Sequence, residues 1–467
     1  GRGVAFRGKV IDYGNSTYLV SYYPTRAGIY RMYITIKTPY SSPTPSPSVG
    51  VLEEISMSGQ YLTHNAPYII TIIPDAIRAE RCVAVGAGLV GGKAGEVMSL
   101  QVLYRDRYNN PTSVQNVDDV KIKFIVTNVV NGDVMVIPYL NITKGYTNTT
   151  VTYTMQRAGK YAVTIQLATP SPAPTSTYKS IVGSPYFITI SPILGDANSV
   201  VLRGVGMRSG GTNVTNTFEV MVYDQFANLH TTGGDKLYVR VLGDANFTVS
   251  NIYVVPRCLD NLNGVYLCTY TPNNPGAHQL VVKLLQLQAN SPGGWGLMGK
   301  YFDNEDGAWD VNATPRVRRV DSMVRFLWSD GVIITPAPAP APTLTLLSHP
   351  LAGQSARWQG YVVAPRTGNW GFRVACRNLH ATVIVEEVMV VDTFTNTSAK
   401  ISMVQDGVYA IRVMATTRGV AVSADMVSKS IDLLWSTDII TEQPVSSFFL
   451  YPFADEVKGS PFPLLVR

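Results

Sequence analysis

The stretch "NTTVTYTMQRAGKYAVTIQL" (148–167) decides the fold of this chain. Apolar and polar residues alternate on both sides of Gly159, so each half can turn one face to a core and the other to water. Glycine permits the positive backbone angle that a tight reversal often needs. The stretch therefore predicts two consecutive β-strands joined by a turn.

Two further copies of this pattern lie on either side of it. They read "STYLVSYYPTRAGIYRMYITI" (16–36), with its turn at Gly28, and "NGVYLCTYTPNNPGAHQLVVKL" (263–284), with its turn at Gly276. Internal repetition on this scale indicates tandem units of one architecture.

Shared pieces also flank the copies. Ahead of the second and third copies, a strand pattern is followed by a turn that carries an aspartate in the same place, Asp106 in "MSLQVLYRDRYNNPT" (98–112) and Asp224 in "FEVMVYDQFANLHT" (218–231). Behind each copy comes a small residue, a proline, an aromatic residue and an apolar run: "NAPYIITIIP" (65–74), "GSPYFITISP" (183–192) and "GSPFPLLVR" (459–467).

The last of these closing strands is displaced. The turn glycine precedes the closing proline by 39 positions in the first copy and by 26 in the second, but Gly276 precedes Pro461 by 185. The surplus of about 150 residues has the size of a whole domain. Because closing a longer loop costs little extra free energy, such an insertion is tolerated. We expect Phe462 and Leu464 to lie beside the strand around residues 280–284.

The order of these pieces resembles the immunoglobulin-like repeat of filamins, whose units run through V…D…NP, GxYxVxYTPxxxGxY and GSPFxxxV. The resemblance covers residues 1–288 and 457–467 and implies antiparallel seven-stranded sandwiches, the last one split between its sixth and seventh strands. The first unit starts near its fourth strand, so it exposes an apolar face and open edges. Either upstream residues supply the other strands, or another chain does so by β-augmentation.

The inserted stretch carries "GWGLMGKYFDNEDG" (294–307) and "ARWQGYVVAPRTGNWGF" (356–372) and closes at "FFLYPF" (448–453). This order resembles the β-sandwich domain named after anthrax protective antigen, which also occurs in glycosidases and fungal adhesins. Four tryptophans lie in strand-like runs, and we expect them to fill the core rather than to stack on sugars. They are Trp328, Trp358, Trp370 and Trp435.

Fungal adhesins of the protective-antigen family bind sugars through a calcium ion held by two consecutive aspartates. The matching stretch here is "ACRNLHATVIVEEVMVVD" (375–392), which has no such pair. Glu386 and Glu387 are adjacent, but strand alternation would send their side chains to opposite faces. Since calcium needs several oxygen ligands in one cage, the resemblance does not carry calcium binding with it.

The predicted fold class is all-β: tandem immunoglobulin-like, filamin-type sandwiches with a protective-antigen-type sandwich inserted in the last one. We name the predicted domains by their boundaries. They are repeat one (1–74, a C-terminal half), repeat two (75–192), repeat three (193–288 plus 457–467) and the insert (289–456).

The composition fits many short strands, with 46% hydrophobic and 15% charged residues, and a net charge of +6 without a basic block argues against nucleic-acid binding. No apolar run is long enough to span a bilayer. The chain starts without Met or a signal peptide, as a processed or partial product would.

Seven Asn-x-Ser/Thr sequons favour a secretory route and covalent N-glycans: Asn15, Asn141, Asn148, Asn213, Asn246, Asn312 and Asn396. Three proline-rich tracts read either as stiff polyproline II linkers or as segments that resemble the hydroxyproline-glycosylated tracts of plant and green-algal wall glycoproteins. Their candidate O-glycosylated prolines are Pro43, Pro45, Pro47, Pro170, Pro172, Pro174, Pro336, Pro338, Pro340 and Pro342.

Four cysteines suit an oxidising compartment. Cys258 and Cys268 flank a turn between two strand-like runs and are predicted to form a disulfide across a hairpin. Cys82 and Cys376 could pair with each other, pair with a neighbouring chain, or stay buried and free.

Motifs for catalysis are missing from the sequence. None of the five histidines has a second ligand at metal-binding spacing, and no nucleophile elbow or phosphate-binding loop occurs. An acidic cluster at 303–310 could hold a cation, but an exposed acidic turn is the commoner outcome. We expect no enzyme, no metal site and no cofactor other than covalent glycans.

Two functions remain in competition. The first is a structural subunit of an extracellular filament, wall or surface fibre that associates with itself, with neighbouring chains completing repeat one. The alternative is a cell-surface adhesion protein that binds glycans or partner cells through the insert. Intracellular actin crosslinking conflicts with the sequons.

Overall fold

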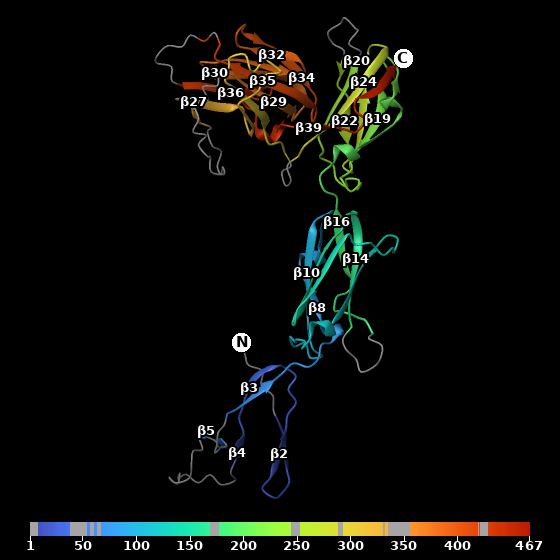
Figure 1. Ribbon diagram of the computed structural model, residues 1–467, viewed down its shortest axis with the longest axis vertical. Coiled ribbons are helices and arrows are strands. Elements are labelled where there is room, and N and C mark those ends of the chain that lie inside the picture. The colour runs from blue at the N-terminus through green and yellow to red at the C-terminus, as the bar shows by residue number, and fades with distance from the viewer. Residues whose placement is uncertain are drawn as a thin grey trace. The chain divides into compact units, whose positions relative to one another are not determined.

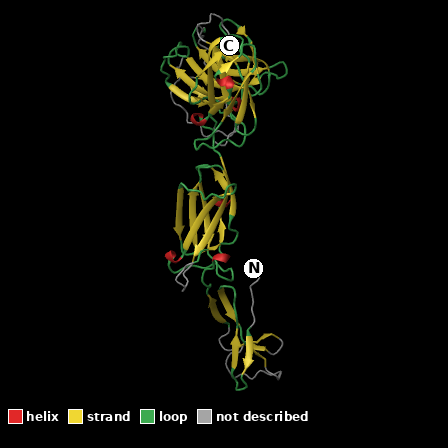
Figure 2. Ribbon diagram, turned by 90° about the vertical axis from the view of Figure 1, so that its right-hand side faces the viewer, coloured by secondary structure: helices red, strands yellow, loops and turns green. Residues whose placement is uncertain are grey.

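A computed structural model describes residues 8–37, 54–56, 60–62, 67–168, 177–243, 253–287, 293–329, 332–334, 355–418, 420 and 428–467. The chain is all-β, and its helical segments are single 3-10 turns (Figures 1 and 2). It divides into two compact units, Gly1–Ser191 and Pro192–Arg467. None of the described helices has the length and apolar character needed to cross a membrane.

Repeat two is a sandwich of two sheets, ordered β12-β13-β10-β8 and β11-β14-β16-β9. Alternation along the strands buries one side of each, and the rings of Phe124 and Tyr153 meet across the core at 5.0 Å. The strands are β8 (Val83–Val85), β9 (Gly91–Lys93), β10 (Val97–Leu103), β11 (Lys121–Asn128), β12 (Tyr139–Lys144), β13 (Asn148–Thr154), β14 (Gly159–Ala168) and β16 (Tyr186–Ser191), and β15 (Lys179–Ser180) also pairs with β14.

Repeat one contains the counterparts of the second half of repeat two. Gly28 lies opposite Ile72 in its β3–β7 pair, as Gly159 lies opposite Ile190 in the β14–β16 pair. Its described strands are β1 (Lys9–Asp12), β2 (Tyr18–Ser21), β3 (Gly28–Met32), β4 (Thr35–Lys37), β5 (Glu54–Ser56), β6 (Gln60–Leu62) and β7 (Tyr68–Ile72). They pair as β1-β2, β3-β7 and β4-β6-β5.

Repeat three is closed by the displaced strand, as the repeat pattern predicted. β40 pairs antiparallel with β24, with Phe462 opposite Leu280 and Leu464 opposite His278. Leu464 and Val466 are buried in the core. The two sheets are β17 (Val201–Arg203), β19 (Asn216–Met221), β23 (Val265–Tyr270) and β22 (Arg257–Asp260), and β18 (Ser209–Gly210), β40 (Phe462–Val466), β24 (Gly276–Leu285), β20 (Leu237–Gly243) and β21 (Tyr253–Val254).

The two ends of the insert lie side by side on repeat three. The chain leaves at the end of β24 and returns through β39 (Ala454–Glu456), which pairs with that same end, Leu285 opposite Ala454. An insertion whose ends adjoin replaces a short surface loop without disturbing the sheet that hosts it.

The insert itself is a second kind of sandwich. Trp358, Trp370 and Trp435 are buried in its core, while the side chain of Trp328 lies outside the described residues. One sheet holds β25 (Leu297–Phe302), β26 (Val317–Asp321), β29 (Ser355–Val363), β31 (His380–Val385), β32 (Val388–Asp392), β33 (Thr397–Ser398), β35 (Val408–Thr416) and β38 (Leu450–Tyr451). The other holds β27 (Arg325–Ser329), β28 (Val332–Ile334), β30 (Gly368–Arg377), β34 (Lys400–Met403), β36 (Ser428–Ser436) and β37 (Gln443–Pro444).

Two of the four cysteines form a disulfide, and the other two are free thiols. Cys258 on β22 lies opposite Cys268 on β23, and the two form a disulfide. Cys82 is buried and Cys376 is half-buried, and both are free. Burial raises the pKa of the Cys82 thiol to about 11, so this thiol is poorly reactive at neutral pH.

Candidate functional site

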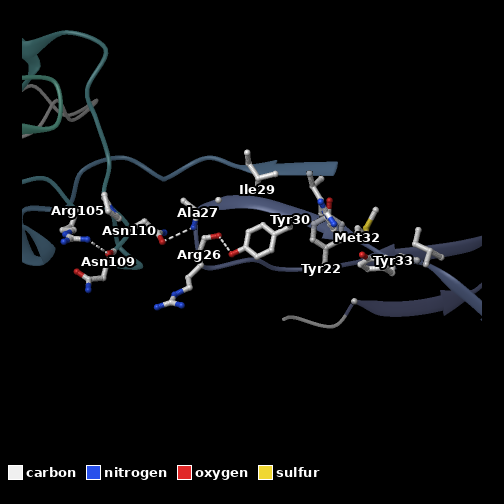
Figure 3. A pocket seen from close by; sticks show the side chains of 17 residues that line it. Tyr22, Arg26, Ala27, Ile29, Tyr30, Met32, Tyr33, Arg105, Asn109 and Asn110 are labelled. Atoms are coloured by element: carbon white, nitrogen blue, oxygen red, sulfur yellow. Dashed lines mark hydrogen bonds between the residues drawn. The ribbon is translucent and has the colours of Figure 1, made fainter. Parts of the chain in front are cut away.

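Repeat one carries an open groove of about 1060 Å³ (Figure 3). Side chains of β2, β3 and β7 line it, and the turn after β10 of repeat two contributes Arg105, Asn109 and Asn110. We call its apolar part the open face. It consists of Val20, Tyr22, Tyr30, Met32, Ile34 and Ile70.

The same positions are core positions in the complete repeats. Tyr22 corresponds to Tyr153 and Tyr270, and Ile70 corresponds to Ile188 and Leu464, all of which are buried. In repeat one, by contrast, Tyr22 is 38% exposed and the rest of the open face is only half-buried.

The difference follows from which strands cover the face. In repeat two, β10 pairs with β13 and β11 pairs with β14, and the side chains of β10 and β11 cover that core. Among its described residues, repeat one has no counterpart of β10 or β11. An exposed apolar face bordered by strand edges is a surface on which further strands can be stabilised.

Asp106 organises the junction beside the groove. One carboxylate oxygen accepts hydrogen bonds from the backbone N–H groups of Tyr108 and Asn110, each at 2.8 Å. The other accepts from the Asn110 side chain at 2.8 Å and from the Asp75 N–H at 3.0 Å. Burial alone would raise the pKa of Asp106, but these four hydrogen bonds outweigh it and lower the pKa.

Asn110 connects this turn to repeat one. Its Nδ2 donates to the Thr25 carbonyl at 3.0 Å. Its Oδ1 accepts from the Ala27 N–H, also at 3.0 Å (Figure 3). The hydroxyl of Tyr108 also hydrogen-bonds that of Tyr23. The two repeats therefore meet through specific polar contacts next to the open face.

Repeat three contains the same aspartate turn. Asp224 accepts from the N–H groups of Phe226 and Asn228 at 2.9 Å, from Asn228 Nδ2 at 3.0 Å and from the Ile193 N–H at 3.2 Å. The repeat pattern aligned Asp106 with Asp224 but predicted no role for them. The asparagine four residues later is the signal that could have revealed the turn.

A buried ion pair joins the insert to repeat three. Arg240 on β20 is 2% exposed, and its Nε and Nη2 donate to the two carboxylate oxygens of Glu386 at 2.9 and 2.7 Å. Nη2 also donates to the Val408 carbonyl at 2.6 Å, and Nη1 donates to the Val239 carbonyl at 2.6 Å. The cation lies over the Tyr238 ring at 4.3 Å.

Apolar contacts surround this ion pair. Leu285 of repeat three packs in one buried cluster with Val363, Val408 and Tyr451 of the insert. A bidentate pair within an apolar contact has one geometry that satisfies both charges, so it fixes the insert on its host.

The expectation for the two glutamates was wrong. Glu386 and Glu387 form the two-residue turn between β31 and β32, with φ of 51° and 63°, and do not continue a strand. Positive φ at both positions matches the twist of a tight hairpin. Glu386 folds back to Arg240, while the Glu387 side chain is 83% exposed.

Two carboxylates of the acidic cluster at 303–310 form ion pairs with arginines. Asp303 pairs with Arg316 at 3.1 Å, and Asp306 pairs with Arg418 at 2.5 Å. Within the described parts of the chain, no group of three or more His, Cys, Asp or Glu side chains is placed to hold a metal ion.

The predicted glycosylation positions differ in their exposure. Asn148 is half-buried in β13, and Asn246 lies outside the described residues. The exposed sequon asparagines are Asn15, Asn141, Asn213, Asn312 and Asn396. All ten candidate prolines lie outside the described residues.

His230 is expected to make the stability of repeat three depend on pH. Its Nδ1 lies 3.0 Å from Asp235 Oδ2, which also accepts from the Tyr266 hydroxyl at 3.0 Å. Burial alone would lower the pKa of His230, but Asp235 outweighs it and raises the pKa. The stabilisation by protonated His230 is therefore complete below the ordinary histidine pKa and is lost as pH rises through the raised value.

Thermal unfolding of the wild type and of His230→Gln, from about pH 5 to about pH 8, measures this dependence. The advantage of the wild type should shrink as pH rises. His380→Gln, at a half-buried histidine of the insert, serves as the control. A pH-independent difference at His230 would show that the ring acts through packing alone.

Comparison with known proteins places the filamin resemblance in repeat three. The family model "Filamin/ABP280 repeat" matches residues 194–292. No curated protein matches the chain.

Solved structures with similar folds include the filamin domain of Lin-41, at 16% identity, with 25% of this chain and 97% of that one covered and a TM-score of 0.19. The PA14 domain of the MpAFP antifreeze protein is 16% identical, and the match covers 36% of this chain and 95% of that one, with a TM-score of 0.25. The Escherichia coli adhesin FdeC is 10% identical, and the match covers 85% of this chain and 100% of that one, with a TM-score of 0.27.

Proposed function

We propose that this protein is a structural subunit of an extracellular glycosylated filament, wall or surface fibre, in which chains associate through the open face of repeat one. The observation that carries the proposal is the contrast at equivalent positions. Residues that are buried in repeats two and three are half-exposed in repeat one.

Apolar area removed from water contributes about 25 cal/mol per Å², so covering the open face with strands of a neighbour stabilises an assembly. The edges of the flanking strands would add backbone hydrogen bonds to such a contact. The exposed sequons would carry glycans, and the proline-rich tracts would carry hydroxyproline-linked glycans of the kind found on algal walls. We assign the chain no enzymatic reaction and no cofactor.

Two neighbouring isoleucines on β7 test the proposal. Ile70 belongs to the open face, whereas Ile69 points away from it and is exposed, like its counterpart Phe187 in repeat two. Sedimentation velocity and electron microscopy of the secreted chain should show polymers for the wild type and for Ile69→Lys.

Ile70→Lys should raise the concentration needed for assembly by at least about tenfold, because it places a charge in the apolar contact. Far-ultraviolet circular dichroism would confirm that both variants keep their β structure. A wild type that stays monomeric, or an Ile70→Lys variant that assembles normally, would refute the proposal.

One observation favours adhesion as a second function. His380 and Phe394 stack with ring centroids 3.8 Å apart, and Phe394 is 47% exposed on the insert. An exposed aromatic face can stack on a sugar ring. Glycan binding that is lost in Phe394→Ala and kept in Phe448→Ala, another exposed phenylalanine, would support this function, and equal binding by both variants would exclude it.

A further inference from the structure

Repeat two carries an exposed apolar knob at the end of β11, which we call the valine tip (residues 128–136). The chain turns back there, so that the N–H of Asn128 donates to the Asp133 carbonyl and the N–H of Met135 donates to the Val126 carbonyl, both at 2.8 Å. Val130 is 89% exposed and Val136 is 87% exposed.

Hydrogen bonds within the valine tip hold its backbone in one conformation. The Asn128 side chain accepts from the Val130 N–H at 2.8 Å, and Asn131 Nδ2 donates to Asp133 Oδ2 at 2.6 Å. Gly132 has a φ of 75°, which the reversal requires. An ordered apolar projection loses little conformational entropy on binding and therefore suits a docking contact.

The charges of the two surfaces favour the groove of repeat one as the docking site of the valine tip. The cationic side chains beside the groove of repeat one are Arg26 and Arg105, and no carboxylate is among the lining residues. Arg31 lies opposite Ile69 and points to the other side of β3. The valine tip contains one charged residue, Asp133, and no cation. The groove is thus apolar and positive, and the tip is apolar and negative, which favours their association and selects its orientation.

The contact cannot form within one chain. The groove adjoins the Asp106 turn at one end of repeat two, whereas β11 runs away from that end and reaches the tip only after eight residues, roughly 26 Å. A groove and a knob at different places on one molecule make a head-to-tail contact, which repeats without closing unless the rotation forms a ring.

We propose that the valine tip of one copy docks into the open groove of repeat one on a second copy, with Asp133 facing Arg26. This inference rests on the proposed function and names the partner surface for its assembly. Strand edges beside the groove can pair with the extended edge of the tip.

Charge reversal tests the pairing. Asp133→Arg and Arg26→Glu should each raise the concentration needed for assembly by about tenfold, because each places like charges together. The double variant Asp133→Arg/Arg26→Glu should recover most of the loss. Arg26 and Asp133 are both exposed, so the sandwich itself should fold as before.

Replacing exposed valines by lysine tests the apolar part of the contact. Val130→Lys should weaken assembly in the same way, while Val205→Lys, at another exposed valine in repeat three, should not. If assembly is weakened by Ile70→Lys but not by Val130→Lys or Asp133→Arg, this inference is overturned and the proposed function stands. A wild-type chain that forms no polymer would overturn both.

Discussion

Replacing Glu386 by alanine should lower the free energy of unfolding of the insert–repeat three unit by about 3–5 kcal/mol, because it leaves the Arg240 guanidinium buried without its counter-ion. Arg240 is 2% exposed and places two of its donors on that carboxylate. Water cannot reach the cation to replace the lost hydrogen bonds, so the cost exceeds that of losing an exposed pair.

The neighbouring residue is the matched control. Glu387→Ala removes an equal side chain from the same turn, and its nearest ion-pair contact is 3.9 Å to Arg412 on an open surface. Its expected effect is below about 1 kcal/mol. Urea denaturation of both variants, followed by tryptophan fluorescence, compares them directly.

A double variant tests whether the unpaired charge causes the loss of stability. Arg240→Met/Glu386→Leu removes both charges and should recover much of the loss, since an apolar pair of similar volume tolerates burial. Equal unfolding free energies for Glu386→Ala and Glu387→Ala would show that the ion pair does not hold the insert to its host.

Replacing Asp106 by alanine should lower the free energy of unfolding of repeat two by about 3–4 kcal/mol, because four N–H donors lose their acceptor at a buried site. The carboxylate is buried, and all four donors come from the turn or from the linker at Asp75. The exposed variant Asp119→Ala is the control, with an effect within about 0.5 kcal/mol.

The same residue should make the wild type sensitive to acid. The pKa of Asp106 is lowered in the folded state, so its stabilisation is present above the ordinary aspartate pKa and is lost as pH falls through the lowered value. Melting temperatures measured from about pH 6 down to about pH 2 should fall more steeply for the wild type than for Asp106→Asn. Parallel curves would contradict the assignment of the charge to this turn.

Asn110→Ala distinguishes the turn from the junction. This change removes the contacts to Thr25 and Ala27 and one of the four hydrogen bonds to Asp106, but it leaves the three backbone donors to Asp106 in place. Limited proteolysis should then cut repeat one faster while repeat two stays intact. Equal protection of repeat one would show that the asparagine contributes little to the junction.

The strand pattern and the displaced closing strand could be predicted from the sequence. Alternation along "TTVTYT" and its copies is a local property of period two, and it decides which side of each strand is buried whatever the neighbours are. The register of β40 on β24 follows from the same regularity, since Phe462 and Leu464 take the places that the second copy assigns to its own closing strand. The long interval before Pro461 sufficed to predict an inserted domain.

Side-chain partners between domains were decided only by the tertiary structure. Arg240 and Glu386 are 146 residues apart, and nothing periodic connects them. Their contact depends on how the insert is rotated on repeat three, and on a turn that takes Glu386 out of the strand pattern that the apolar sequence around it suggested. The exposure of the open face is likewise a tertiary property, because the same alternating sequence is buried wherever two more strands cover it.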